Sequence, residues 1–303
     1  MLCYEGRENV ANYDAVKRSA LAIAGKVDRF DELSATDWIG MQSYIAQIAD
    51  GARVVVDITG LSRLITLRLL TLLYRRRIAL SLLYTEAKEY YPRRADFAGF
   101  LAHRDPSDAF GELISYEAAD IMYSSECRVE QIPELPGHIF PTHPVMLIAF
   151  LAFKRSRLSC ILSQYETNFR VFVKSVPVRR DLRWRARALE VINFDLLEEN
   201  LENIEPAPTL DWIATFRTLS RLYDQDNRRY RFNVLLAPLG GKMQTIGAWY
   251  FAVTNPDVRV ITSTPGRHFP DKYSIGWTRT HWVPMDAIYT PDLLPEDEPM
   301  GQE

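Results

Sequence analysis

The clearest pattern of apolar positions is a strand, a turn and a helix in the first third of the chain. Residues 52–57 form an apolar, β-branched run, which is typical of a buried strand. After the turn Ile58-Thr59-Gly60, apolar residues recur every three or four positions over 61–77, which predicts a helix. Residues 78–84 predict the next strand, so this region reads as one strand-helix-strand unit of a parallel sheet.

The same order of elements returns about 180 positions later. Residues 232–237 predict a strand, 238–242 a glycine turn, 243–253 a helix and 258–262 the following strand. An extra helix is predicted at 210–223, after two prolines.

The likeness of the two halves extends upstream. Each half has a first strand, a helix, a second strand and another helix, predicted in the first half at 2–4, 10–25, 27–30 and 38–49, and in the second half at 145–153, 158 onward, 170–173 and 182–201. We therefore predict an α/β protein of two Rossmann-like lobes with mostly parallel sheets. An internal duplication would relate the lobes as a pseudo-two-fold pair.

This reading divides the chain into four parts. Residues 1–92 are the first lobe, and 145–284 are the second lobe. The turn-rich segment 93–144 fits a linker or an inserted subdomain, and 285–303 fits an acidic tail.

Composition adds a few exclusions to this picture. With 303 residues, 47% of them hydrophobic and 25% charged, the chain can bury a core, so disorder along most of its length is excluded. The net charge of −3 gives no overall attraction to nucleic acid or anionic lipid. No apolar run is long enough to cross a bilayer, and we expect no signal peptide. Three scattered cysteines without a CxxC pair favour reduced thiols in a cytoplasmic protein.

Several basic residues fall where ligands bind in α/β proteins, outside the carboxyl ends of the strands. The turns predicted there carry five cations, namely Arg7, Arg63, Lys154, Arg155 and Lys242. Cations near a helix N-terminus oppose the helix dipole, so an anionic ligand would explain their placement. The alternative is that they are solvated, or pair with Glu5, Asp57 or Glu86.

Neither glycine turn has a standard nucleotide-binding pattern. Gly240-Gly241-Lys242 lacks the earlier glycine of a P-loop, and Met243 stands where a magnesium-binding Ser or Thr would be. Thr59-Gly60 lacks the spaced glycines of the dinucleotide fingerprint. Gly60, Gly240 and Gly241 would instead permit tight turns and close approach of a ligand to the backbone.

Two segments, 57–63 and 238–247, resemble the glycine-threonine-lysine turn of CRISPR-associated Rossmann-fold (CARF) sensor domains. In that family the turn and its helix face a cyclic oligonucleotide across a two-fold axis. The resemblance implies a pseudo-dimeric sensor whose ligand would be lined by Thr59, Ser62, Arg63, Gly240, Gly241 and Lys242. The chain departs from the family at Leu61, where a second glycine is expected, and shows no evident appended nuclease domain.

Aromatic and polar residues follow the last predicted strand of the first half. Tyr84 and Tyr91 could stack on a base, while Thr85 and Glu86 could hydrogen-bond its edge. The alternative is that the tyrosines pack between sheet and linker. The matching segment 263–274 is also aromatic and polar, and a bound nucleotide would account for both.

Metal and catalytic signals are weak. The five histidines have no metal-binding spacing and no neighbouring cysteine, so we predict no metal site and no cofactor. Glu5, Asp57 and Glu86 could act as acid and base in cleaving a glycosidic or phosphodiester bond of a nucleotide. Such carboxylates more often cap helices or neutralise arginines.

The densest basic stretch is 179–187. Arg180, Arg183 and Arg187 would share a helix face that, with Arg179, could contact nucleic-acid phosphates. A solvated face that pairs with Glu198, Glu199 or the acidic tail is the simpler interpretation.

The sequence thus predicts a cytoplasmic sensor or adaptor that binds a phosphorylated, nucleotide-type ligand between two lobes and reports it to a protein partner. The resemblance to CARF domains implies a role in antiviral defence. The alternatives are a nucleotide-cleaving enzyme and a structural subunit that contacts nucleic acid or protein through 179–187.

Overall fold

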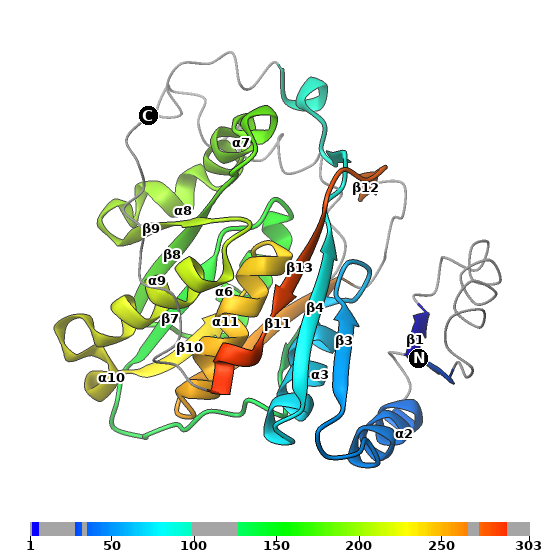
Figure 1. The fold of residues 1–303 in the computed structure, drawn as a ribbon. Coiled ribbons are helices and arrows are strands. Elements are labelled where there is room, and N and C mark those ends of the chain that lie inside the picture. The colour runs from blue at the N-terminus through cyan, green and yellow to red at the C-terminus, as the bar shows by residue number, and fades with distance from the viewer. Residues whose placement is uncertain (1, 6–27, 32–34, 99–126, 266–272, 290–303) are drawn as a thin grey trace.

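The computed structural model describes residues 2–5, 28–31, 35–98, 127–265 and 273–289 (Figure 1). The helix predicted at 10–25, Arg7 and most of the predicted linker and acidic tail lie outside these residues. Glu5 is described only as the last residue of a strand.

The largest sheet has six strands and is mostly parallel. Its strands are β6 (Cys127–Gln131), β7 (Val145–Phe150), β8 (Phe169–Val176), β9 (Ile204–Pro208), β10 (Asn233–Ala237) and β11 (Arg259–Pro265). They lie in the order β6-β11-β10-β7-β8-β9, and only β6 runs antiparallel to its neighbour. The predicted mixed α/β class with a mostly parallel sheet is confirmed.

The order of the five parallel strands creates a switch point. Counted along the chain from β7 to β11, they stand in the order 3-2-1-4-5 of a doubly wound fold. The chain leaves β7 toward one side of the sheet and β10 toward the other, so the carboxyl ends of β7 and β10 border the crevice where such folds bind ligands.

Strands of the first half form smaller sheets. β1 (Leu2–Glu5) pairs in parallel with β2 (Asp28–Asp31), and β3 (Arg53–Asp57) pairs in parallel with β4 (Ala79–Thr85). In the described part of the chain these two pairs belong to separate sheets.

Two strands near the C-terminal end of the described chain pair with strands of the first half. β13 (Thr280–Pro284) runs antiparallel along β4, and β12 (Ser274–Ile275) pairs with β5 (Glu89–Tyr90). In the opposite direction, β6 comes from the segment 93–144 and joins β11 of the six-stranded sheet. The second half of the chain therefore supplies an antiparallel edge strand to the sheet of β3 and β4, and the segment 93–144 supplies one to the six-stranded sheet.

The helices mostly connect these strands. The α-helices are α2 (Ala35–Ala46), α3 (Arg63–Arg75), α6 (Arg155–Gln164), α7 (Trp184–Ile192), α8 (Phe194–Glu198), α9 (Trp212–Asp224), α10 (Arg228–Arg231) and α11 (Lys242–Thr254). Short 3-10 turns are η1 (Arg94–Phe97), η2 (Arg180–Leu182), η3 (Leu201–Asn203), η4 (Gln225–Asn227) and η6 (Asp286–Tyr289).

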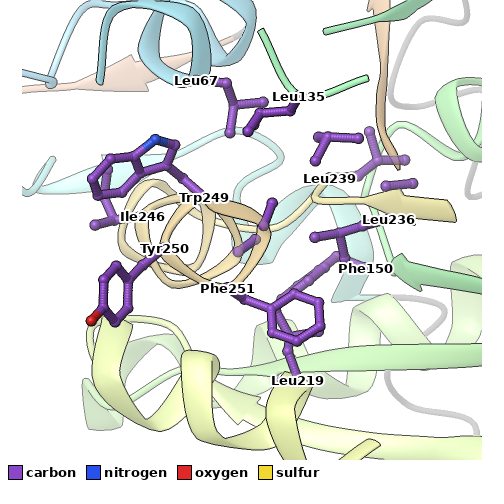
Figure 2. Packing of buried hydrophobic residues seen from close by; sticks show 14 of the residues in the cluster. Leu67, Leu135, Phe150, Leu219, Leu236, Leu239, Ile246, Trp249, Tyr250 and Phe251 are labelled. Carbon is purple, nitrogen blue, oxygen red and sulfur yellow. The ribbon is translucent and has the colours of Figure 1, made fainter. Parts of the chain in front are cut away.

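The helix α11 lies at the centre of the core. It is buried on all its faces and packs against α3 on one side and α9 on the other (Figure 1). Figure 2 shows Trp249 on the side of α11 near Leu67 of α3, and Phe251 on the side near Leu219 of α9. An all-round apolar helix is stable only in such an interior position.

Close packing of α11 on α9 depends on Gly247. A β-carbon built there would lie 2.3 Å from the carbonyl oxygen of Trp212 and 2.7 Å from Cβ of Thr215. We expect Gly247→Ala to lower the free energy of unfolding by about 1–3 kcal/mol. The steric overlap costs more than the ~1 kcal/mol by which helix propensity favours alanine over glycine. Urea denaturation measures the change, and Gly60→Ala is the control because nothing lies within 4 Å of its added carbon. Unchanged or increased stability would contradict the close contact.

One predicted helix is wrong. Residues 182–201 form not one helix but η2, α7, α8 and η3, with a break at Asn193. Its buried side-chain amide donates to the carbonyl oxygens of Leu189, at 2.9 Å, and Ala152, at 3.3 Å. Asparagine side chains compete with the backbone for such bonds, and Asn193 leaves helical geometry at φ −113° and ψ 23°.

Candidate anion-binding site

The helices α3 and α11 begin in the same way. Each has 13 residues and starts with a basic residue, Arg63 or Lys242. In α3 the hydroxyl of Thr66 donates to the carbonyl oxygen of Ser62 at 2.7 Å. At the equivalent place in α11, the hydroxyl of Thr245 donates to the carbonyl oxygen of Gly241 at 3.0 Å.

Different residues cap the two helices. The Ser62 hydroxyl accepts from the backbone N–H of Ile65 at 3.2 Å, which is a regular N-cap. At α11 the backbone N–H of Gly241 donates to the side-chain oxygen of Gln244 at 2.8 Å. The same buried glutamine bonds Ser175 of β8 and the carbonyl of Ala207 in β9, so it fixes the start of α11 to the large sheet.

The two helix starts bond each other reciprocally. Arg63 Nη2 donates to the carbonyl oxygen of Gly240 at 2.7 Å, two residues before α11 begins. Lys242 Nζ donates to the carbonyl oxygen of Leu61, two residues before α3 begins. Gly240 is needed there because a β-carbon would lie 2.5 Å from the oxygen of Gln244.

Two basic residues at the start of α6 lie near the starts of α3 and α11. Arg157 Nε donates to the carbonyl oxygen of Ser263 at 2.8 Å, and Lys154 Nζ lies 5.2 Å from the centre of the Tyr273 ring. We call Arg63, Lys154 and Arg157 the cation cluster.

Burial and mutual repulsion destabilise the charges of the cation cluster. Burial, and then the neighbouring Arg157, hold the pKa of Arg63 well below its ordinary value. The same two causes lower the pKa of Lys154, and burial lowers that of Arg157. Among the described residues, no carboxylate lies within ion-pair distance of any of the three. An anion bound among them would relieve both effects.

The cation cluster lies at the switch point of the sheet. Lys154 and Arg157 follow β7, and Gly240, which Arg63 contacts, follows β10. This is the crevice that the strand order singles out for ligand binding.

Of the other predicted anion ligands, Arg155 is engaged elsewhere. It forms an ion pair with Asp195 of α8. The structure therefore brings Arg63, Lys154 and Lys242 together and separates Arg155 from them.

The predicted acid and base residues lie in local networks. Glu86 is 4% exposed; its carboxylate lies 2.6 Å from His281 Nε2 and 3.8 Å from Arg179 Nη1. Asp57 accepts from the backbone N–H of Thr59 at 2.9 Å, as in a tight turn.

The residues predicted to contact a base also have partners within the protein. The Tyr84 hydroxyl lies 3.0 Å from that of Tyr90, and burial raises the pKa of Tyr84 above its ordinary value. Thr85 N–H donates to the Thr59 hydroxyl at 2.9 Å. Tyr91 N–H donates to the carbonyl oxygen of Tyr273 at 2.9 Å, which places Tyr91 next to the ring that faces Lys154.

Two arginines of the basic stretch 179–187 form hydrogen bonds or ion pairs within the protein. Arg179 bonds Asp181 at 2.5 Å and the carbonyl oxygen of Ala87 at 2.7 Å, and Arg187 pairs with Glu190 of its own helix at 3.5 Å. Arg180 and Arg183 are exposed. Since η2 ends before α7 begins, Arg180 does not share one continuous helix with Arg187.

The sequence reasoning missed Arg157 and Tyr273. The apolar period placed the start of the helix at residue 158, whereas α6 begins at Arg155. The signal that could have found Arg157 is the spacing of basic residues at 154, 155 and 157, since two of the three side chains face the switch point.

Comparison with protein-family models found no match, and comparison with curated proteins found none either. None of the helices that the structure describes is long and apolar enough to span a membrane. Within the same residues, no group of three or more His, Cys, Asp or Glu side chains is arranged to hold a metal ion.

Proposed function

We propose that this protein binds a phosphorylated, nucleotide-type ligand at the cation cluster. The observation that carries the proposal is a set of half-buried cations without a carboxylate partner among the described residues, at the switch point of a doubly wound sheet. A phosphate would supply the missing negative charge and accept hydrogen bonds from Lys154 and Arg157. Lys242 and the turns at Thr59–Gly60 and Gly240–Gly241 would border it.

We further propose that the chain is an internal duplication whose halves form a pseudo-two-fold pair. The reciprocal bonds of Arg63 and Lys242, and the matching Thr66 and Thr245 bonds, support this relation. The pairing of β12 with β5 and of β13 with β4 joins the two halves as well.

The role we propose is that of a sensor or adaptor that reports the bound ligand to a protein partner. Its support is the resemblance of the two helix-opening turns to CARF domains, together with their pairing across the molecule. An antiviral role and a cytoplasmic location follow from the same resemblance and from the reduced-thiol composition, and both stay predictions.

A thermal-shift screen tests ligand binding. The full chain would be heated with inorganic phosphate, nucleoside mono- and triphosphates, and linear and cyclic oligonucleotides. We expect at least one phosphorylated compound to raise the melting temperature, since a ligand at 100 times its Kd adds about 2.7 kcal/mol. No shift with any of these anions would overturn the proposal.

The pH dependence of stability tests the electrostatics of the cluster without a ligand. The pKa of Lys154 is lowered in the folded protein from an ordinary value of 10.5, so its charge costs stability at neutral pH. That cost falls as the pH rises from the folded-state pKa toward the unfolded-state value. We expect Lys154→Met to be more stable than the wild type at pH 7, with a gap that narrows by about pH 10.

Denaturant unfolding at both pH values measures this gap, and Lys88→Met, at an exposed lysine, is the control. A Lys154→Met protein less stable than the wild type at pH 7 would contradict the assignment.

Catalysis is the second candidate, and the close pairing of Glu86 with His281 favours it. The best ligand from the screen would be incubated with the protein and the products analysed. If turnover occurs and Glu86→Gln leaves it unchanged, Glu86 has no catalytic role.

A further inference from the structure

One aromatic side chain, that of Tyr273, lies against the cation cluster. The Nζ atom of Lys154 lies 5.2 Å from the centre of the Tyr273 ring, which is within cation–π distance. Tyr273 also opposes electrostatically the lowering of the pKa values of Arg63 and Arg157, so its side chain lies close to both arginines. A single tyrosine is thus near all three members of the cluster.

The backbone around Tyr273 is held by hydrogen bonds. The carbonyl oxygen of Tyr273 accepts from the backbone N–H of Tyr91 at 2.9 Å, and the next residue, Ser274, pairs with Tyr90 where β12 meets β5. Tyr90 is fixed in turn by its hydroxyl, which lies 3.0 Å from that of Tyr84. Because the backbone is already ordered, a ligand that contacts the Tyr273 ring has little conformational entropy to remove there.

Exposure distinguishes Tyr273 from the two tyrosines predicted to meet a base. Tyr273 is 45% exposed, whereas Tyr84 is 9% exposed. Tyr91 is half-buried. A base can stack only on a ring whose surface it can reach. Tyr273 is therefore the one of the three that combines exposure with a position beside the cations.

We propose that Tyr273 is the surface on which the nucleobase of the ligand stacks while its phosphates bind the cation cluster. This inference rests on the proposed function and adds the part of the ligand that cations do not recognise. Cations bind inorganic phosphates and nucleotides alike, because both carry the same negative oxygens. A ring beside them favours ligands in which a flat π-system is joined closely to a phosphate, as the ribose joins them in a nucleotide. Tyr273 thus sets the preference for nucleotides over inorganic polyphosphates.

Calorimetric titration of the full chain with ADP and with inorganic pyrophosphate tests the proposal. The two probes carry the same pair of phosphates and differ in the nucleoside, and every base offers a face for stacking. We expect the wild type to bind ADP more tightly than pyrophosphate. Tyr273→Leu removes the ring, so it should weaken ADP binding about 5- to 100-fold and leave pyrophosphate binding unchanged. Tyr273→Phe keeps the ring and should bind both probes as the wild type does.

The matched control is Tyr230→Leu. Tyr230 is also an exposed tyrosine beside a cation, with the Arg229 guanidinium 4.6 Å from its ring centre, but it lies on α10, outside the cation cluster. This variant should bind both probes as the wild type does. Unchanged ADP affinity in Tyr273→Leu, or an equal loss for both probes, would overturn the stacking role and leave the cation cluster as the anion site. A wild type that binds neither probe would overturn this inference, and the thermal-shift screen would then decide separately on the proposed function.

Discussion

Replacing Trp249 by alanine should lower the free energy of unfolding by about 3–5 kcal/mol. The Trp249 side chain is 0% exposed and lies where α11 packs on α3. Its indole N–H donates to the Thr71 hydroxyl at 3.1 Å, and its ring meets that of Tyr74 edge-on at 5.8 Å. Figure 2 shows Trp249 on α11 near Leu67 of α3, so the substitution would remove both contacts and leave a cavity between these two helices. The N-termini of the same helices carry Arg63 and Lys242.

The matched control is another tryptophan. Trp277 is 75% exposed, so Trp277→Ala should change the free energy of unfolding by less than about 0.5 kcal/mol. Guanidinium denaturation followed by circular dichroism compares the two variants without depending on tryptophan fluorescence. A loss below about 1 kcal/mol in Trp249→Ala would mean that α3 and α11 do not pack as described.

Local patterns in the sequence were enough to predict the central elements. The β-branched run at 52–57 and the apolar run at 232–237 became β3 and β10, and the helices predicted after them became α3 and α11. These elements follow from residues that are close in sequence, because strand and helix periodicities are local properties.

Pairings between distant segments could not be predicted in the same way. β6 reaches β11, and β13 reaches β4, across more than a hundred residues of chain. Nothing in the alternation of either short strand specifies its partner, since register depends on the surface that it meets. The break at Asn193 also escaped prediction because it depends on a bond to Ala152, far away in the chain.

The candidate site was predictable in part for the same reason. Arg63, Lys154 and Lys242 were selected from their positions after strands, by a geometric rule for α/β sheets. Whether a cation meets a carboxylate depends on tertiary contacts, so the pairing of Arg155 with Asp195 could not be distinguished in advance from the placement of Lys154.

Replacing Arg157 should distinguish a role in ligand binding from a role in folding. We expect the affinity for the ligand to fall while the stability of the ligand-free protein stays equal or rises. Arg157→Gln removes a half-buried cation beside Arg63, so repulsion within the cation cluster falls and stability without ligand should stay equal or rise. The glutamine amide can still donate to the Ser263 carbonyl that Arg157 now bonds.

For a phosphorylated ligand the same substitution should weaken affinity about 10- to 100-fold, since a hydrogen bond between charged groups contributes about 1.5–3 kcal/mol. Titration calorimetry would use inorganic pyrophosphate and the nucleotide with the largest thermal shift. Arg183→Gln is the control because Arg183 is exposed and lies outside the cation cluster.

The combination of outcomes decides between a ligand-binding and a structural role for Arg157. A purely structural arginine would lower stability when replaced, and any loss of affinity would follow from unfolding. A ligand-binding arginine would lower affinity in a protein that melts at the same or a higher temperature. Unchanged affinity in Arg157→Gln, with the ligand bound as tightly as by Arg183→Gln, would place the phosphate elsewhere and remove the cation cluster from the proposed function.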